Sequence, residues 1–265
     1  MVLEVEYRGS VAIATLSAEA ARNAFSSESM QGISDTLNQL MDDANVKSIV
    51  ITGTGKFFCA GADIEEFQRC IDEARIGPLV DNLTSILHPL QVRMRTDPTV
   101  LVAAMNGAAA GGGLGLALAC DARIAAPEAK LAAAFFKLGL SPDGGTTWLL
   151  PRLVGNQVTR RFFFNDEIWN GEEAHQKGAV DAVVGMDDLI DTAVEWATNW
   201  GKWSQLSRSG TKQLLDASTS TFFQTQLEFE QALIIAASQT KQFEEGVAAF
   251  LEKRDPDFDL SLIHI

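Results

Sequence analysis

The sequence predicts an α/β protein, and three observations support that prediction. Short apolar or β-branched runs, such as residues 48–52 and 99–104, have the length and composition of buried strands. These runs alternate with segments of helical periodicity, an order typical of α/β domains. Only helical periodicity remains from about residue 187 onward. We therefore expect a core over residues 1–195 and a helical C-terminal region over residues 196–265.

The N-terminal part predicts two strands, a helix and a third strand. The two strands lie at residues 3–7 and 11–16. Ser26 or Ser27 then caps a helix that runs to about residue 43, because a serine hydroxyl accepts hydrogen bonds from the N–H groups that open a helix. The third strand is the β-branched run described above, and a glycine-punctuated loop follows it.

The middle of the chain repeats this alternation. A largely apolar helical stretch over residues 79–94 is interrupted by Pro89 and leads to the strand at residues 99–104. A run of small residues then predicts a helix that begins near the triple glycine at 111–113. Two short strands are expected between residues 121 and 134, followed by helices.

Composition limits the possible partners and compartment. The 265 residues carry a formal net charge of −14, which disfavours nucleic acid and anionic membranes as partners. No apolar run approaches the ~20 residues that cross a bilayer. Acids stand near the N-terminus where a signal peptide has basic residues. The 3 cysteines are scattered and odd in number, as expected in a reducing compartment. We predict a cytoplasmic protein without a nucleic-acid or membrane partner.

Two glycine-rich segments resemble nucleotide-binding motifs only in part. Residues 53–56 follow a strand, but Phe57 stands where a phosphate-binding loop needs Ser or Thr. Gly111 and Gly113 begin a dinucleotide pattern, but Leu116 takes the place of its third glycine. Neither segment therefore predicts a nucleotide site.

Metal and covalent chemistry find no support either. His88, His175 and His264 lack metal-ligand spacing, so solvated or core histidines are the better interpretation and no metal is expected. The chain contains no Gly-x-Ser-x-Gly elbow, and Cys59 has no histidine near it in sequence. A covalent Ser or Cys hydrolase is disfavoured.

Two other segments remain as candidates for chemistry, residues 57–64 and 105–115. Small side chains in both allow the backbone to approach a ligand closely. The second segment also opens a helix, whose unpaired N–H groups favour developing negative charge. Two converging N–H groups would form an oxyanion hole, worth roughly 3–4 kcal/mol per donor. Tight turns and close helix packing are the structural alternative for either segment alone.

Together, in this order and about fifty residues apart, the two segments resemble the crotonase (enoyl-CoA hydratase/isomerase) superfamily. The resemblance extends over nearly the whole chain, through Asn23-Ala24, residues 138–146 and residues 245–254. It implies a crotonase-like core that spirals through ββα units, with a C-terminal helical trimerisation region. It also implies a homotrimer or a dimer of trimers.

The resemblance implies an acyl-CoA thioester as partner and no separate cofactor, because coenzyme A arrives as part of the substrate. The oxyanion donors would be the N–H groups of Ala62 and Gly112. Lys253 would lie near the nucleotide phosphates, often those of a neighbouring subunit, although an ordinary solvated lysine is the alternative. Residues expected to bind the substrate or its coenzyme A are Arg22, Ala24, Ala60, Asp63, Ile64, Gly111, Phe135, Trp148, Phe250 and Lys253.

The residues at the acid/base positions favour an isomerase. The two glutamates of related hydratases fall at Gly115 and Phe135 here, so both are absent. Asp143 resembles the single carboxylate of enoyl-CoA and dienoyl-CoA isomerases, and the segment around it resembles the epoxyphenylacetyl-CoA isomerases of phenylacetate breakdown. One carboxylate suits a double-bond shift, since it can remove a proton from one carbon and return it to another. Helix capping by Asp143 is the structural alternative.

Three other functions stay open. One is a hydratase with a non-standard acid or base, for which Glu65 and Glu66 are subordinate candidates. A second resembles the 4-chlorobenzoyl-CoA dehalogenases, with Asp143 as nucleophile. In that relative a Trp and a His assist, and Phe135 or Phe136 stands near the Trp position here. The third is an acyl-CoA binder that has lost its chemistry.

Overall fold

The computed structural model describes residues 3–18 and 22–259. In that part of the chain the strands form two sheets, with the orders β1-β2-β3-β5-β7-β10 and β4-β6-β8-β9. The strands are β1 (Leu3–Arg8), β2 (Val11–Leu16), β3 (Ser48–Gly53), β4 (Phe57–Cys59), β5 (Val100–Met105), β6 (Ala108–Ala110), β7 (Ala122–Ala125), β8 (Lys130–Ala132), β9 (Ile168–Asn170) and β10 (Ala182–Val183). The helices are α1 (Ser27–Asp42), α2 (Ile64–Asp72), α3 (Ile76–Thr96), α4 (Gly112–Ala119), α5 (Thr146–Val154), α6 (Asn156–Phe164), α7 (Gly171–Gln176), α8 (Leu189–Gly201), α9 (Gln205–Ser218), α10 (Phe223–Ser238) and α11 (Lys241–Glu252).

From β3 to β8, successive strands alternate between the two sheets. β3, β5 and β7 are parallel neighbours in the larger sheet, and β4, β6 and β8 are parallel neighbours in the smaller one. Each turn of the chain therefore contributes one strand to each sheet before the chain returns through helices or loops. This is the expected ββα spiral, and the predicted α/β class is confirmed.

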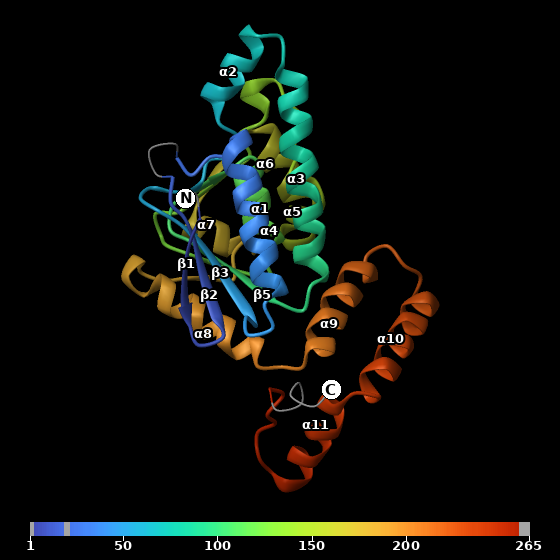
Figure 1. The fold of residues 1–265 in the computed structure, drawn as a ribbon. Coiled ribbons are helices and arrows are strands. Elements are labelled where there is room, and N and C mark those ends of the chain that lie inside the picture. Colours follow the sequence, from blue (N-terminus) through green and yellow to red (C-terminus); the bar gives the residue numbers. More distant parts are fainter. Residues whose placement is uncertain (1–2, 19–21, 260–265) are drawn as a thin grey trace.

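The central strands of the larger sheet, β2, β3 and β5, are buried on both faces. Neighbouring side chains on a strand point to opposite sides, so each of these strands contributes to two cores. Along β2, Ala12 and Leu16 pack into the core that contains side chains of α1, α3 and α4. Ile13 points the other way, into a second core with Ala193 and Ala197 of α8. Figure 1 shows α1 and α3 side by side over the sheet, with α8 on its other side.

The helix boundaries largely follow the predicted signals. Ser26 caps α1, with its hydroxyl oxygen accepting from the N–H of Ser29. The prediction that Pro89 interrupts its helix is wrong, because α3 continues through it to Thr96. Proline removes one backbone hydrogen bond, but burial of a leucine-rich face holds α3 against the core. The buried apolar residues on that face are Leu79, Leu83, Leu87, Leu90 and Met94.

The C-terminal helices extend from the core (Figure 1). Residue 195, the predicted end of the core, lies within α8, which packs on the larger sheet. A buried ion pair between Lys212 Nζ of α9 and Asp121 Oδ2 (2.7 Å) fastens the next helix to the core. The same ammonium group donates to the carbonyl oxygen of Thr99 at 2.7 Å. Among the helices of the described ranges, none combines the length and apolar character needed to cross a bilayer.

Candidate active site

Three loops meet at one edge of the smaller sheet. β4, β6 and β8 are parallel neighbours, so their carboxyl ends lie at the same edge. The segments that follow these strands begin at Ala60, Gly111 and Ala133, and each leads to residues that line one cavity. The spiral therefore brings together segments that are far apart in the sequence.

The first loop presents the N–H of Ala62. Phe25 holds the backbone on both sides of it, because the Phe25 N–H donates to Gly61 O (2.7 Å) and the Asp63 N–H donates to Phe25 O (2.9 Å). Gly61 has a φ of +83°, and a Cβ there would lie 2.7 Å from Ala110 O, so only glycine fits. Within the described part of the chain, no acceptor meets the Ala62 N–H.

The second loop presents the N–H of Gly112 at the first residue of α4. Gly111 precedes it with a φ of +52°, and no acceptor among the described residues meets the Gly112 N–H. A Cβ on Gly61 would lie 3.3 Å from Gly112 N, so the two loops are in direct contact. Two unpaired N–H groups, one of them at a helix N-terminus, can stabilise an oxyanion there.

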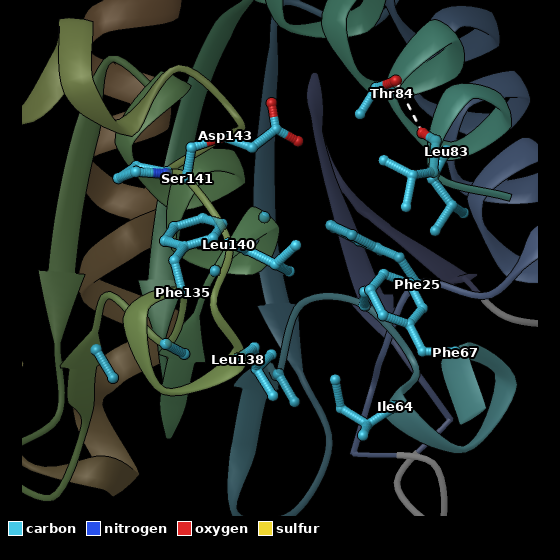
Figure 2. A pocket seen from close by; sticks show the side chains of 18 of the residues that line it. Phe25, Ile64, Phe67, Leu83, Thr84, Phe135, Leu138, Leu140, Ser141 and Asp143 are labelled. Carbon is cyan, nitrogen blue, oxygen red and sulfur yellow. Dashed lines mark hydrogen bonds between the residues drawn. The ribbon is translucent and has the colours of Figure 1, made fainter. Parts of the chain in front are cut away.

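These loops border a cavity of about 620 Å³. Ala62 and Gly112 line it, together with apolar side chains such as Phe25, Leu83 and Phe135. Figure 2 shows these side chains around the cavity, with the Asp143 carboxylate extending toward the side that carries Leu83 and Thr84. The cavity size is within the range of small-molecule sites, roughly 300–1,000 Å³.

Asp143 does not cap α5. The N-cap of that helix is Gly145, with a φ of +71° and no side-chain cap. The Asp143 carbonyl instead accepts from Thr146 Oγ1 (2.8 Å), and the next carbonyl, of Gly144, accepts from Gln91 Nε2 of α3 (2.9 Å). The backbone is thus fixed from two sides, and the carboxylate lines the cavity.

His88 of α3 contacts that carboxylate, a partnership that the sequence did not predict. His88 Nε2 lies 2.8 Å from Asp143 Oδ1, and both side chains are about half exposed. The sequence interpretation treated His88 as solvated or core because it belongs to no motif. The two residues are 55 positions apart, and only the packing of α3 on the loop brings them together. A single sequence contains no signal for this pair.

The two positions of the missing glutamates are both filled. A Cβ on Gly115 would lie 2.1 Å from Gly144 O, so the Asp143 loop occupies the space that a side chain at 115 would need. Phe135 is buried and lines the cavity as an apolar wall. No carboxylate therefore stands at either position.

The predicted site residues divide into two groups. Seven of them line the cavity, namely Ala60, Ala62, Ile64, Gly111, Gly112, Phe135 and Asp143. The others do not line it. Asp63 caps α2, and Trp148 stacks under the Arg152 guanidinium. Arg22 is exposed next to the first loop and Ala24 is buried beside it, whereas Phe250 and Lys253 lie on or after α11, away from α2 in Figure 1.

Two other groups near the site have structural roles. Burial raises the pKa of the Cys59 thiol to about 12, so this cysteine is protonated at neutral pH and is a poor nucleophile. Glu66 accepts from the N–H and hydroxyl of Ser27, which anchors α2 to the start of α1. Glu65 is exposed.

The chain matches the family model described as "Enoyl-CoA hydratase/isomerase" over residues 6–260. A 1,2-epoxyphenylacetyl-CoA isomerase of Escherichia coli (strain K12) is 34% identical, with 92% of this chain and 93% of the relative covered. A probable enoyl-CoA hydratase of Bacillus subtilis (strain 168) is 35% identical, with 89% and 90% covered. Both relatives are therefore similar over almost their entire length.

Solved structures agree with the fold. An enoyl-CoA hydratase from Bacillus anthracis superposes with a TM-score of 0.89 at 30% identity, covering 97% of this chain and 99% of that one. The solved structure thus shares the fold of this chain, and the family model covers nearly all of it. This chain belongs to the enoyl-CoA hydratase/isomerase family.

Proposed function

We propose that the protein is an acyl-CoA isomerase, which shifts a double bond or isomerises a ring-epoxide thioester through an enolate held by Ala62 and Gly112. The observation that carries the proposal is the single available carboxylate. Among the described residues that line the cavity, the acids are Asp143 and Asp166. Asp166 is bound to Lys137, with Nζ and Oδ2 2.6 Å apart. Asp143 is thus the one acid in position to exchange protons with a substrate.

One carboxylate is sufficient for the shift. With a 3-enoyl thioester, Asp143 takes a proton from C2, and the electron pair of that C–H bond moves into the thioester carbonyl. The enolate oxygen accepts hydrogen bonds from the N–H groups of Ala62 and Gly112, which are preorganised for it. Asp143 then returns the proton to C4, and the remaining double bond lies between C2 and C3. Atoms and charge balance without another reactant.

Asp143→Asn tests this assignment. We expect wild-type protein to convert a 3-enoyl-CoA to the conjugated thioester, measured by its absorbance. The variant should lose about 10²- to 10⁴-fold in kcat, the usual contribution of a general acid–base group. Asp166→Asn is the matched control, because it removes the other cavity carboxylate, and its kcat should change little.

Three results would contradict the proposal. Conversion unchanged by Asp143→Asn would move the search to Glu65 and Glu66. Hydration of a 2-enoyl-CoA at a rate comparable to isomerisation would favour a hydratase with a non-standard acid. No conversion of a 3-enoyl-CoA, together with binding of acyl-CoA, would contradict the double-bond shift and leave the ring-epoxide substrate, dehalogenation or a non-catalytic binder.

The contact between His88 and Asp143 favours one second candidate. In a dehalogenase-like reaction, Asp143 would attack a chlorinated ring carbon of 4-chlorobenzoyl-CoA and displace chloride. A histidine assists in the relatives that do this, and His88 lies 2.8 Å from Asp143 here. Phe135 or Phe136 stands near the position where those relatives have a tryptophan, which favours the isomerase. Chloride release from 4-chlorobenzoyl-CoA would decide for the dehalogenase.

A further inference from the structure

The cavity wall opposite Asp143 is made of hydrocarbon. Helix α3 contributes Val80, Leu83 and Leu87, and the segments around it contribute Phe25 and Phe67. Figure 2 shows Phe25, Phe67 and Leu83 grouped on this side. The hydroxyl of Thr84 also faces the cavity, but it donates to Val80 O within its own helix (2.8 Å). An acyl chain would therefore make dispersion contacts with this wall and find few hydrogen-bond partners on it.

The cavity also lacks a free positive charge on its described residues. Its charged side chains are Lys137, Asp143 and Asp166. The ammonium group of Lys137 is 2.6 Å from Asp166 Oδ2, and its side chain is 79% exposed, so this lysine is paired with a carboxylate and is largely in solvent. The remaining charge is the negative one of Asp143. A carboxylate on the acyl group would lose its water here without gaining a cation.

We propose that the site selects thioesters whose acyl group is an uncharged hydrocarbon, aliphatic or aromatic, and rejects thioesters of dicarboxylic acids. The inference rests on the proposed function for placing the acyl-CoA in this cavity, and it adds the chemistry of the acyl group. Val80 is a specificity-determining position in this assignment, because it lines the cavity from a partly exposed place on α3. A cation introduced there would change the preference.

Hexanoyl-CoA and adipoyl-CoA are a matched pair for the test. Both carry six acyl carbons and no double bond to shift, so binding is measured without turnover. By titration calorimetry on the full chain, hexanoyl-CoA should bind at least about tenfold tighter than adipoyl-CoA, because the unpaired carboxylate is the only difference. Equal affinities, or tighter binding of adipoyl-CoA, would overturn the proposal.

Val80→Arg should reduce the ratio of the hexanoyl-CoA affinity to the adipoyl-CoA affinity at least about tenfold. The new guanidinium would strengthen binding of adipoyl-CoA and weaken binding of hexanoyl-CoA. Val92→Arg is the matched control, since Val92 is on the same helix, is 65% exposed and is outside the lining. A similar shift in both variants would overturn the proposal, because a general charge effect would then explain it. A protein inactive on 3-enoyl-CoA that still prefers hexanoyl-CoA would refute the double-bond shift and keep this inference. A protein that isomerises 3-enoyl-CoA but binds hexanoyl-CoA and adipoyl-CoA equally would support the isomerase and overturn this inference.

Discussion

At the scale of single residues, the proposed isomerisation depends on how Asp143 is held. Its carboxylate is bound by His88, its own carbonyl by Thr146, and the neighbouring carbonyl of Gly144 by Gln91. Thr146 and Gln91 bind backbone carbonyls and not the carboxylate. The Asp143 carboxylate therefore contacts His88 and faces the cavity. Displacing a reacting group by about 1 Å can lower the rate of a reaction by roughly 10²-fold.

His88→Leu tests the contribution of this contact. We expect kcat on a 3-enoyl-CoA to fall by about 10- to 100-fold with little change in KM, because the base loses its orientation and the acyl contacts remain. His88→Gln keeps a hydrogen-bond donor and should recover part of the rate. Ser85→Ala, one turn earlier on α3, is the control. A His88→Leu enzyme with wild-type kcat would show that Asp143 needs no partner.

Gly115→Glu tests the closed position of the first hydratase glutamate. The new Cβ would overlap Gly144 O, so we expect a loss of about 1–3 kcal/mol or more in unfolding free energy. Gly32→Glu is a matched control at an exposed position of α1, where nothing lies within 4 Å of an added Cβ. Urea denaturation compares the two. If Gly115→Glu retains full stability and hydrates a 2-enoyl-CoA, the close packing described here is wrong.

At the scale of elements, local sequence patterns predicted helices and strands better than they predicted contacts between side chains of different elements. Strands β1, β2, β3 and β5 and helix α1 were predictable, because short apolar or β-branched runs and a serine cap are local signals. The two-residue strand β10 was not predicted. Pro89 misled the prediction, since burial of the leucine face of α3 outweighs one lost hydrogen bond. The two candidate oxyanion loops were indicated by their small residues and by the resemblance. The contact of His88 with Asp143 depends instead on how α3 packs, which no local pattern encodes.

Helix α9 is joined to the core by a buried ion pair, and Lys212→Met tests its contribution. Removing the ammonium group leaves Asp121 buried without its cation, so we expect a loss of about 3–5 kcal/mol in unfolding free energy. Lys241→Met breaks the exposed pair with Glu244 and should cost at most about 1 kcal/mol. Thermal denaturation measures both. Equal effects of the two variants would show that the buried pair does not fasten α9.

At the scale of the whole molecule, the C-terminal helices expose much apolar surface. Phe250 is 84% exposed and Ile234 is 68% exposed, and several other large apolar side chains on α10 and α11 are also exposed. Exposed apolar patches of this kind mark surfaces for protein association. They fit the predicted homotrimer, in which α11 would carry Lys253 to the site of a neighbouring subunit.

Association is testable by light scattering. We expect wild-type protein to have the mass of three chains or a multiple of three. The double variant Ile234→Glu, Phe250→Glu should shift toward single chains, because it places charges on the apolar surface of α10 and α11. Tyr7→Glu, on exposed strand β1, should leave the mass unchanged. A monomeric wild-type protein would contradict the prediction.

Helix α3 both lines the cavity and contacts the loop that carries Asp143. Its Leu83 and Leu87 line the cavity, while its His88 and Gln91 hold the loop of the base. An acyl group that fits poorly and displaces α3 would also displace Asp143, through the same rigid segment. Discrimination between acyl groups should then appear in kcat as well as in binding affinity. The reason is that α3 would transmit the position of the acyl group to the proposed base.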